Sequence, residues 1–324
     1  MESNWPAQQA IPAVVDHYQL VRILGSGGTG IVCEAHDTLL GRRVAIKLIP
    51  NKQTAGSDQP QIMREARIAS EVKHPHVVSL YDTGTYAGGV YLVMELVEGR
   101  SVQSLLDEGP LPWREATAIL VAACEGLAAV HARGIIHRDI KPGNILLEKV
   151  DSRQNTVDSG NAIGASTTPK SDCSATDYRL STTDYSSLTG GFFVKITDFS
   201  LARWLDQSKR SATWKRLAGT PHYMSPEQCR EEEYDERTDI YSLGATYFAV
   251  LTGCMPYAGS TPLRVMFEHC SAPVPDPCKG DREIPIACAE IVIRAMAKKR
   301  ADRYDSARDM QNALRKVLQS DARR

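Results

Sequence analysis

The sequence predicts an α+β protein in which a small, strand-rich lobe precedes a larger helical lobe. Between Tyr18 and about Val97, alternating and β-branched apolar runs are separated by Gly, Asp and Asn, as is typical of antiparallel strands. After Gly99 the apolar residues recur at helical spacing instead. A chain of 324 residues is long enough for both lobes to bury a core. Ligands commonly bind at such a junction, so we expect a functional cleft between the lobes.

The first lobe is predicted to contain five strands and one helix. The expected strands are Tyr18–Ile23, Ile31–Ala35, Val44–Ile49, Val77–Leu80 and Val90–Leu96. The helix is expected over Gln61–Val72, where Ile62, Ala66 and Ala69 keep the helical spacing.

The second lobe is predicted to be mainly helical. The expected helices are Trp113–Arg133, Thr238–Thr252, Pro262–His269, Ile286–Ala297 and Ser306–Gln319, and Phe193–Ile196 is an expected strand. The most apolar stretch, 116–132, is interrupted by Glu125 and His131 and is too short to cross a bilayer, so it predicts a buried helix.

Composition and charge narrow the class of protein. Apolar residues make up 42% of the chain and charged residues 24%, with a net charge of −1, so no electrostatic pattern indicates nucleic acid or an anionic membrane as a partner. The eight cysteines include no CxxC pair, which favours neither a zinc site nor a disulfide framework and is typical of a reducing compartment. The first twelve residues lack the build of a signal peptide. We therefore expect a cytoplasmic protein without a membrane segment in this chain.

Residues 148–191 differ from the rest in composition. They are rich in Ser, Thr, Asp, Asn and Gly and show no apolar period, so they cannot bury enough surface to offset their ordering entropy. This segment predicts a disordered insertion. The expected organisation is an N-terminal extension (1–17), a first lobe (18–97), a second lobe with the insertion (98–318) and a tail (319–324).

A glycine-rich run follows the first expected strand. Gly25, Gly27 and Gly30 have the GxGxxG spacing, which lets backbone amides approach phosphate oxygens. The run by itself leaves open a dinucleotide fold or a plain glycine-rich hairpin. A dinucleotide fold requires a helix next, whereas here the strand Ile31–Ala35 follows. A hairpin over phosphates remains.

Lysine occurs in an otherwise apolar strand in the run VAIK. Lys47 follows Val44, Ala45 and Ile46, and Glu65 lies on the next expected helix. A lysine paired with a carboxylate can hold the α- and β-phosphates of a nucleotide. A solvated edge lysine is the plainer interpretation of this feature alone.

The run HRDIKPGN, after the apolar helix, is the most specific motif. Asp139 can accept the proton of an incoming hydroxyl, Lys141 can neutralise charge on a moving phosphoryl group, and Asn144 can bind magnesium through its carbonyl oxygen. Downstream, Asp198 ends the run KITD and would supply a second metal ligand, although a strand-ending aspartate is common in turns.

The ordered motifs resemble the signature set of the eukaryotic-type (Hanks-type) protein kinases. The glycine run, VAIK, HRDIKPGN, DFS, SPE and DIYSLG occur in the family's order over roughly 18–318, and the style resembles the bacterial serine/threonine kinases. The resemblance implies a bilobal protein kinase fold, a small antiparallel sheet with one main helix above a helical lobe. It implies a serine/threonine protein kinase that uses ATP and Mg²⁺, acts on protein substrates and autophosphorylates, with self-association as a possible consequence.

The resemblance also implies a role for individual residues. Lys47 would anchor phosphates with Glu65 as its partner, Asp139 would be the catalytic base, Lys141 would stabilise the γ-phosphoryl group, and Asn144 and Asp198 would hold magnesium. The adenine would lie between Val32, Ala45 and Leu146, beside the gatekeeper Met94 and the backbone of Glu95 and Val97. Leu80, Ala69, His137 and Phe199 match the stack that aligns the lobes above Asp239, and Glu227 would pair with Arg303.

Specificity and regulation follow from the same resemblance. Lys141 in DIKPGN and Thr220, which would bridge Asp139 and Lys141, match serine/threonine kinases. Arg138 and Arg203 would form a basic pocket for a phosphate on the activation loop, with Ser211 or Thr213 as the preferred acceptors over Ser208.

The sequence departs from the family at Ser200, where glycine is usual. If that position requires φ > 0, serine costs about 1–2 kcal/mol, which shifts a conformational equilibrium without removing a ligand. The expectation is an active enzyme, and the alternative is a pseudokinase or scaffold of weak activity.

Overall fold

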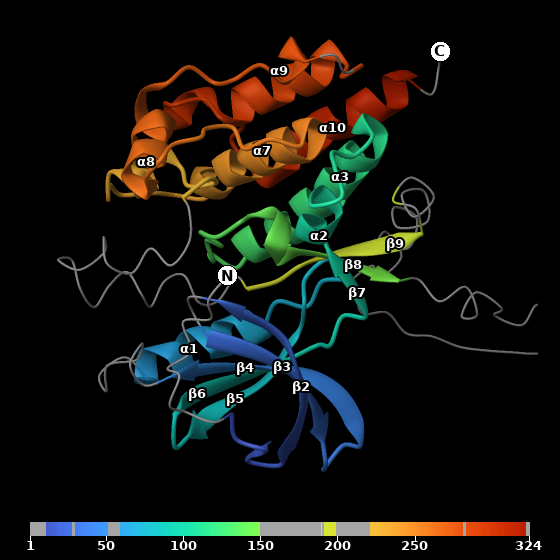
Figure 1. Ribbon diagram of the computed structural model, residues 1–324, viewed down its shortest axis with the longest axis vertical. Helices are drawn as coiled ribbons and strands as arrows, with labels where there is room; N and C mark the ends of the chain where they lie inside the picture. The colour runs from blue at the N-terminus through green and yellow to red at the C-terminus, as the bar shows by residue number, and fades with distance from the viewer. Residues whose placement is uncertain are drawn as a thin grey trace, which may run out of the picture.

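The computed structural model describes residues 11–27, 30–50, 59–149, 189, 191–198, 221–280 and 283–321. These residues form the two expected lobes, which Figure 1 shows with the sheet lobe below the helical lobe. The predicted α+β class is therefore confirmed. The expected insertion, apart from its two ends, lies outside the described residues.

The first lobe is built on an antiparallel sheet with the strand order β1-β2-β3-β4-β6-β5. The strands are β1 (Val14–Val15), β2 (Tyr18–Gly27), β3 (Gly30–Asp37), β4 (Arg42–Pro50), β5 (Leu80–Tyr86) and β6 (Gly89–Met94). Strand β4 is buried on both faces. Ile46 and Leu48 pack in a small outer cluster, whereas Ala45 and Ile49 face the main core. Because side chains alternate along a strand, Lys47 shares the inner face with Ala45 and Ile49.

The expected strand Val77–Leu80 is wrong, because β5 begins only at Leu80. Val77 and Val78 are buried, but they lie alongside the other lobe. The backbone N–H of Val78 donates to Ile196 O (2.9 Å), and Ile196 N donates to His76 O (3.0 Å). The β-branched pattern there reflects burial against the strand that ends near Asp198.

One helix, α1 (Gln59–Ser70), covers the inner face of this sheet (Figure 1). Ala66 and Ala69 are fully buried in the main core, as their spacing predicted. The helix begins two residues earlier and ends two residues earlier than Gln61–Val72, the expected range.

A second, smaller antiparallel sheet lies at the junction of the lobes. Its order is β7-β8-β9, with β7 (Gly99–Ser101), β8 (Ile145–Lys149) and β9 (Phe192–Ile196). Strand β7 and the short helix α2 (Val102–Leu106) were not predicted, since neither is long enough to show a period. Strands β8 and β9 place Ile145 opposite Ile196, so the ends of the two metal-ligand motifs are neighbours.

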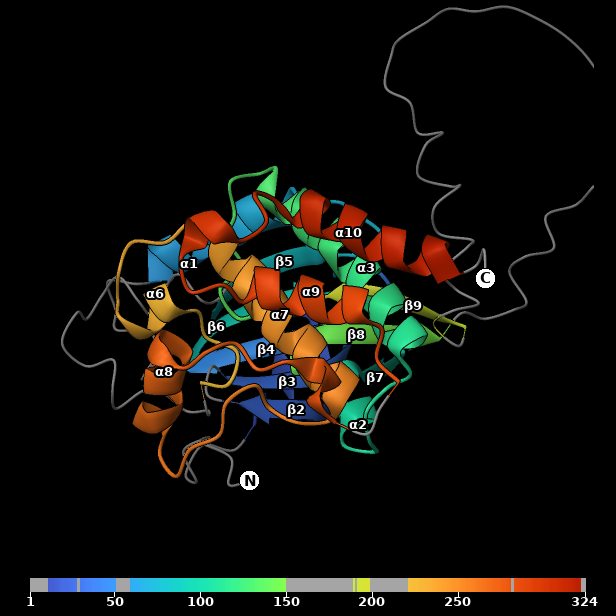
Figure 2. The same cartoon turned by 90° about the horizontal axis from the view of Figure 1, so that it is seen from above.

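The second lobe consists of packed helices. They are α3 (Trp113–His131), α6 (Pro226–Cys229), α7 (Arg237–Thr252), α8 (Pro262–Ser271), α9 (Ile286–Ala295) and α10 (Ala307–Asp321), joined by single turns η1 (Pro142–Asn144), η4 (Pro277–Lys279) and η5 (Arg300–Asp302). Helix α3 is buried over most of its length, as predicted, and α10 lies along it (Figure 2). None of the helices in the described part of the chain combines the length and apolarity required to span a membrane.

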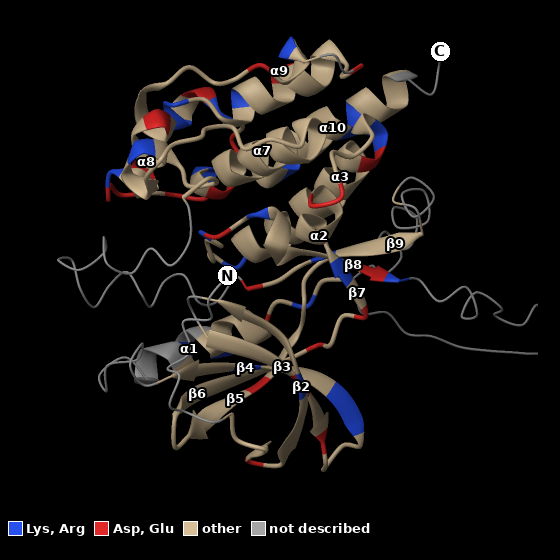
Figure 3. Cartoon of the chain, viewed as in Figure 1, with Lys and Arg blue, Asp and Glu red and all other residues tan. Residues whose placement is uncertain are grey.

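Charged residues of both signs occur along both lobes (Figure 3). On α8, for example, Arg264 forms an ion pair with Glu268 one turn later. On the inner strand β3, buried Glu34 pairs with Arg22 on β2 at 2.8 Å and with Arg43 on β4 at 3.3 Å.

Candidate active site at the junction of the lobes

Lysine 47 and aspartate 198 meet across the junction. The Nζ of Lys47, nearly fully buried on β4, lies 3.1 Å from Oδ2 of Asp198, which follows β9. Burial by itself favours the neutral carboxyl of Asp198, but the charge and hydrogen bond of Lys47 outweigh it, so the pKa of Asp198 lies below its ordinary value. The charge of Lys141 acts in the same direction. The carboxylate is therefore held in the ionised form that a metal ion requires.

The loop between α3 and β8 holds three of the predicted site residues in one hydrogen-bond cluster. Lys141 Nζ donates to Asp139 Oδ2 (2.7 Å), and Asn144 Nδ2 donates to both the carbonyl oxygen and Oδ2 of Asp139 (2.7 and 3.0 Å). Asp139 is exposed, whereas Asn144 is buried in the turn η1. The amide nitrogen of Asn144 is thus turned toward Asp139, which leaves its carbonyl oxygen as the atom available to a cation.

The two candidate metal-binding residues lie at the ends of neighbouring strands, Asn144 directly before β8 and Asp198 two residues after β9. Thr197 comes directly before Asp198, and its backbone N–H donates to the backbone carbonyl oxygen of Asn144 (3.0 Å). The side-chain oxygen of Asn144 takes no part in this bond. Among the described residues, His, Cys, Asp and Glu nowhere gather in a group of three or more with metal-binding geometry. Two oxygen donors from the protein suit Mg²⁺, which keeps several waters and takes its other ligands from substrate phosphates. The donor set therefore fits the predicted ion.

His137 lies beneath this cluster and is neutral. Its Nε2 lies 2.9 Å from the carbonyl oxygen of Thr197, and its Nδ1 accepts the backbone N–H of Asp139 at 3.3 Å. These partners define the tautomer, with the proton on Nε2. Full burial lowers the pKa of His137 more than the nearby carboxylates of Asp239 and Asp139 raise it. An imidazole of this kind can position Asp139 but carries no charge.

Two residues of the site have left-handed backbone conformations that side chains rarely adopt. Arg138 has φ = 70° and Asp198 has φ = 69°. Each such conformation costs about 1–3 kcal/mol and persists only where the surroundings impose it. The carboxylate of Asp239 on α7 supplies part of that support, since it accepts the backbone N–H groups of both His137 and Arg138 at 2.7 Å.

The glycines of the run lie at the facing ends of β2 and β3, where Gly27 pairs with Gly30 and Gly25 pairs with Val32, one of the apolar residues expected around adenine. Gly30 has φ = 138°, and a Cβ there would lie 2.1 Å from the carbonyl oxygen of Leu48, so only glycine fits. Added Cβ atoms at Gly25 and Gly27 would meet nothing within 4 Å. The four expected lining residues belong to the main core or pack against it; they are Val32, Ala45, Met94 and Leu146.

Glu95 contributes more than the backbone atoms expected of it. Its Oε1 lies 2.5 Å from Nζ of Lys195 on β9, and its Oε2 accepts the backbone N–H of Ser79 at 3.1 Å. This buried lysine was not predicted as part of the site, although a charged residue inside the apolar run FFVKI is a signal in the sequence. The pair connects the segment after β6 with the strand that leads to Asp198.

The remaining predicted residues are only partly covered by the described part of the chain. Val97, expected beside the adenine, is described, and with its neighbour Leu96 it packs against the main core. The side chain of Glu65 is not described, so its pairing with Lys47 stays a prediction. The rest of the DFS motif after Asp198, and the predicted residues of the activation loop, lie outside the described residues; they are Phe199, Ser200, Arg203, Ser208, Ser211, Thr213 and Thr220.

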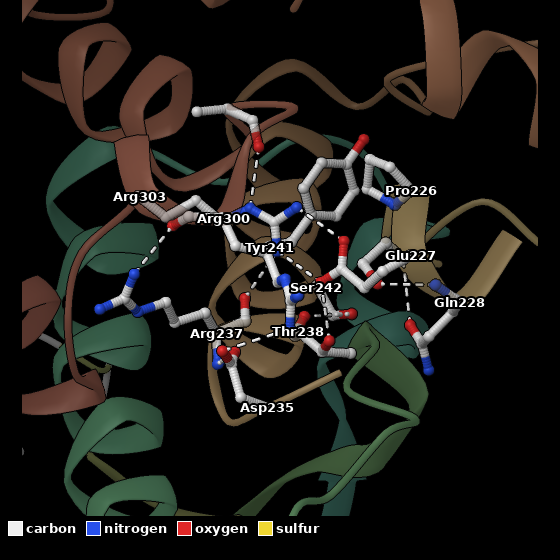
Figure 4. A network of polar contacts seen from close by, with 12 residues as sticks. Pro226, Glu227, Gln228, Asp235, Arg237, Thr238, Tyr241, Ser242, Arg300 and Arg303 are labelled. Carbon is white, nitrogen blue, oxygen red and sulfur yellow. Dashed lines mark hydrogen bonds and ion pairs between the residues drawn. The ribbon is translucent and has the colours of Figure 1, made fainter. Parts of the chain in front are cut away.

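The expected pair of Glu227 on α6 and Arg303 is confirmed (Figure 4). The guanidinium binds the carboxylate through two bonds, Nη1 to Oε1 at 2.7 Å and Nη2 to Oε2 at 2.8 Å, and both residues are buried. Thr238 on α7 donates a third bond to Oε1 (2.7 Å). Burial raises the pKa of Glu227, but the charge and hydrogen bonds of Arg303 leave it lowered. This pair fixes the short helix α6 to the base of the lobe.

The lobes, the lysine–aspartate contact and the HRDIKPGN loop together define the protein kinase class of fold. The chain matches the protein kinase domain family over residues 18–318, and it belongs to that family. Members of this family in general use ATP and Mg²⁺.

Among named proteins the chain is similar to bacterial serine/threonine kinases. It is 33% identical to the serine/threonine-protein kinase PknB of Mycobacterium leprae over 313 residues, which is 94% of this chain and 44% of that protein. It is 31% identical to the serine/threonine-protein kinase PrkC of Bacillus subtilis, over 94% of this chain and 41% of that protein. The chain thus spans less than half the length of these relatives.

Solved kinase structures show the same fold. A crystal structure of the PknI kinase domain of Mycobacterium tuberculosis superposes with a TM-score of 0.66 over 95% of this chain and 99% of that chain, at 21% identity. At this identity the likeness concerns the fold alone.

Proposed function

We propose that the protein is a serine/threonine protein kinase that transfers the γ-phosphoryl group of ATP to Ser and Thr hydroxyls of proteins, including its own. The observation that carries the proposal is the convergence of Lys47, Asp139, Lys141, Asn144 and Asp198 at the junction of the lobes, from segments up to 151 residues apart. In this proposal residues 18–97 form the nucleotide-binding lobe and 98–318 the peptide-binding lobe, between an extension (1–17) and a tail (319–324).

The nucleotide would bind between the lobes. Val32, Ala45, Met94 and Leu146 supply apolar surface for adenine, the backbone of Glu95 and Val97 supplies hydrogen bonds to its edge, and the glycine run covers the phosphates. Lys47, supported by Glu65, holds the α- and β-phosphates.

Asn144 and Asp198 would hold Mg²⁺, which neutralises charge on the β- and γ-phosphates. Asp198 is suited to this role because its pKa is lowered and it stays ionised at neutral pH. The ammonium group of Lys47 contacts the Asp198 carboxylate in the structure. When Mg²⁺ binds to that carboxylate, the ammonium group would turn toward the phosphates.

Asp139 would accept the proton of the attacking hydroxyl. It is exposed, as a base that must reach an incoming protein side chain needs to be, and its orientation is fixed by Asn144. Lys141 is 2.7 Å from the same carboxylate and can stabilise the transferring phosphoryl group. The spacing of Asp139 and Lys141 supports Ser and Thr as acceptors, and in this proposal Thr220 would bridge the two residues.

Regulation by phosphorylation belongs to the same proposal. Arg138, which lies over the ring of Tyr234 at 4.8 Å, and Arg203 would bind a phosphate on Ser211 or Thr213, and Ser200 would favour a resting arrangement. We propose a cytoplasmic location for this domain and self-association during autophosphorylation. The named relatives are kinases, so the pseudokinase alternative has no support from them.

A transfer assay tests the proposal. Wild type, Asp139→Asn and a matched surface control, Asp302→Asn, are incubated with γ-labelled ATP, Mg²⁺ and a generic protein substrate. Removing a general base costs about 10²–10⁴-fold, so Asp139→Asn should lose label by that factor while Asp302→Asn retains it. Acid hydrolysis should release phosphoserine and phosphothreonine. Wild type that binds MgATP but transfers no label would instead identify a pseudokinase.

A further inference from the structure

Gln228 on α6 connects the segment expected to position the peptide with the loop that carries Asp139. Its side chain contacts two backbone groups from distant parts of the chain. Oε1 accepts the N–H of Ser225 (3.0 Å), and Nε2 donates to the carbonyl oxygen of Arg138 (2.9 Å), 90 residues earlier. Because one partner is a donor and the other an acceptor, these two contacts fix which way the amide is turned.

The contact with Ser225 completes a helix cap. Ser225 Oγ accepts the backbone N–H of Gln228 (3.3 Å), and the Gln228 side chain accepts the backbone N–H of Ser225 in return. This reciprocal arrangement requires an acceptor at the side-chain end of residue 228, and glutamate satisfies it as well as glutamine does. The second contact, by contrast, requires a donor. The two halves of the amide therefore serve separable purposes.

The carbonyl of Arg138 belongs to the peptide group that joins Arg138 to Asp139. The N–H of this peptide donates to His137 Nδ1 (3.3 Å), so both of its polar atoms are held by side chains. The preceding peptide is held through the N–H of Arg138, which donates to Asp239 (2.7 Å). Arg138 itself has φ = 70°, a conformation that would relax if either peptide rotated. Gln228 thus restrains the last rotation before the Asp139 side chain.

We propose that Gln228 is a positioning residue for Asp139, which couples the placement of α6 to the orientation of the catalytic carboxylate. The inference rests on the proposed kinase function and adds a link between the peptide-binding segment and the base. Helix α6 is itself anchored by Glu227 through Arg303 (Figure 4). Through the contact of Gln228 with Arg138, the restraint extends from the base of the second lobe to the site. Misplacement of a reacting group by about 1 Å can cost about a hundredfold in rate.

Two substitutions separate the positioning role from a structural one. Gln228→Glu keeps the acceptor for Ser225 but replaces the donor toward Arg138 with a carboxylate oxygen that repels the carbonyl. Gln228→Met removes both contacts and adds no charge. Because Gln228→Glu keeps the helix cap, it should be more stable than Gln228→Met. Because it disturbs the contact with Arg138 more strongly, the positioning role predicts a lower kcat for Gln228→Glu than for Gln228→Met. If Gln228 were merely structural, kcat would follow the melting temperature.

The experiment measures melting temperature, kcat and KM for ATP in wild type, both variants and Gln311→Glu. Gln311 is a matched control, since its buried amide donates to Val121 O (3.2 Å) between α3 and α10, away from the site. We expect kcat to fall about tenfold to a hundredfold in Gln228→Glu and less in Gln228→Met, with an unchanged KM for ATP. Gln311→Glu should lower the melting temperature and leave kcat unchanged below it.

Each outcome has one meaning. Wild-type kcat in a folded Gln228→Glu variant would overturn the inference alone, and so would a kcat order that matches the order of stability. If Gln228→Glu does not fold, Gln228→Met is measured in its place, and a wild-type kcat in that variant would overturn the inference. Unfolding of both variants would also overturn it. Absence of transfer by wild type would overturn the proposed function and this inference with it.

Discussion

The backbone N–H of Arg138 donates a 2.7 Å hydrogen bond to Oδ1 of Asp239, a buried carboxylate on α7. The other oxygen, Oδ2, accepts the N–H of His137 (2.7 Å) and lies 2.8 Å from His131 Nε2. One side chain thus holds two consecutive peptides, including the one at the strained residue, 101 residues earlier in the chain. Hydrogen bonds to a charged group contribute about 1.5–3 kcal/mol each, enough to offset a left-handed conformation.

We expect Asp239→Asn to reduce both stability and activity, because an amide places a donor against at least one of the N–H groups. Loss of one charged hydrogen bond should lower the free energy of unfolding by about 1.5–3 kcal/mol. We expect kcat for peptide phosphorylation to fall at least about tenfold, with little change in KM for ATP. Steady-state kinetics and thermal melting measure this, with Asp302→Asn as the surface control. Unaltered kcat would show that Asp239 does not position the loop.

The buried pair of Glu227 and Arg303 should be costly to break from one side. Arg303→Met leaves the Glu227 carboxylate buried without its partner, which should destabilise the protein by about 3–5 kcal/mol in urea unfolding. The double change, with Glu227→Leu added, should recover part of this loss because no buried charge is left. Arg300→Met is the control, since the Arg300–Asp235 pair (3.3 Å) is about half exposed and should contribute less than about 1 kcal/mol. Equal costs for the two arginines would contradict this account.

Stability should fall when the pH is lowered below about 6.5, the ordinary histidine pKa. Burial lowers the pKa of His137, and burial together with Lys298 lowers the pKa of His269 to about 3. Below pH 6.5 the unfolded chain therefore binds protons that the folded chain does not, and the free energy of unfolding decreases as pH falls.

The contribution of His269 to the loss of stability at low pH can be measured by comparing wild type with a His269 variant. At pH 5 one such histidine costs about 2 kcal/mol relative to neutral pH. In His269→Gln, whose amide oxygen can still accept from the Tyr241 hydroxyl (2.8 Å from Nδ1 in wild type), melting temperature should depend less steeply on pH between 7 and 5. Parallel curves for wild type and variant would exclude His269 as a source of the acid slope.

Magnesium should increase the stabilisation that ATP gives, because Asp198, the proposed metal ligand, contacts Lys47, the proposed phosphate-binding residue. At a ligand concentration of a hundred times Kd, binding adds about 2.7 kcal/mol to the free energy of unfolding. The melting temperature of wild type with MgATP should therefore be several degrees higher than its melting temperature with ATP and EDTA. In Asp198→Asn the two shifts should become equal. Equal shifts in wild type would show that Asp198 holds no metal with the nucleotide.

The sequence predicted which candidate site residues come together where those residues lie close to one another in the chain. In HRDIKPGN the residues Asp139, Lys141 and Asn144 lie within six positions, so a single turn brings their side chains together. Lys47 was predicted from one lysine among apolar neighbours, and the alternation along β4 places it on the inner face. The buried helix α3 was predicted from its continuous apolar run.

Predictions of secondary structure failed where a strand or an extended segment forms because its backbone bonds to a segment distant in the sequence. Val77 and Val78 have the composition of a strand, but the N–H of Val77 donates to His74 O and the N–H of Val78 donates to Ile196 O at the junction, and β5 starts later. Strand β7 exists because β8 pairs with it, with Ser101 opposite Leu146. Such elements are too short for a period, and their hydrogen-bond partners are invisible in the local sequence.

The sequence by itself determined the two lobes, the order of the motifs and the side chains that each motif brings together, because periodicity and local chain geometry act over a few residues. The tertiary structure alone decided that Lys47 contacts Asp198, that Lys195 binds Glu95, and that Gln228 and Asp239 hold the backbone before Asp139. These contacts join residues 90 to 151 positions apart. They form because a buried polar group must find a partner wherever the packed core places one, and only the folded chain specifies that place.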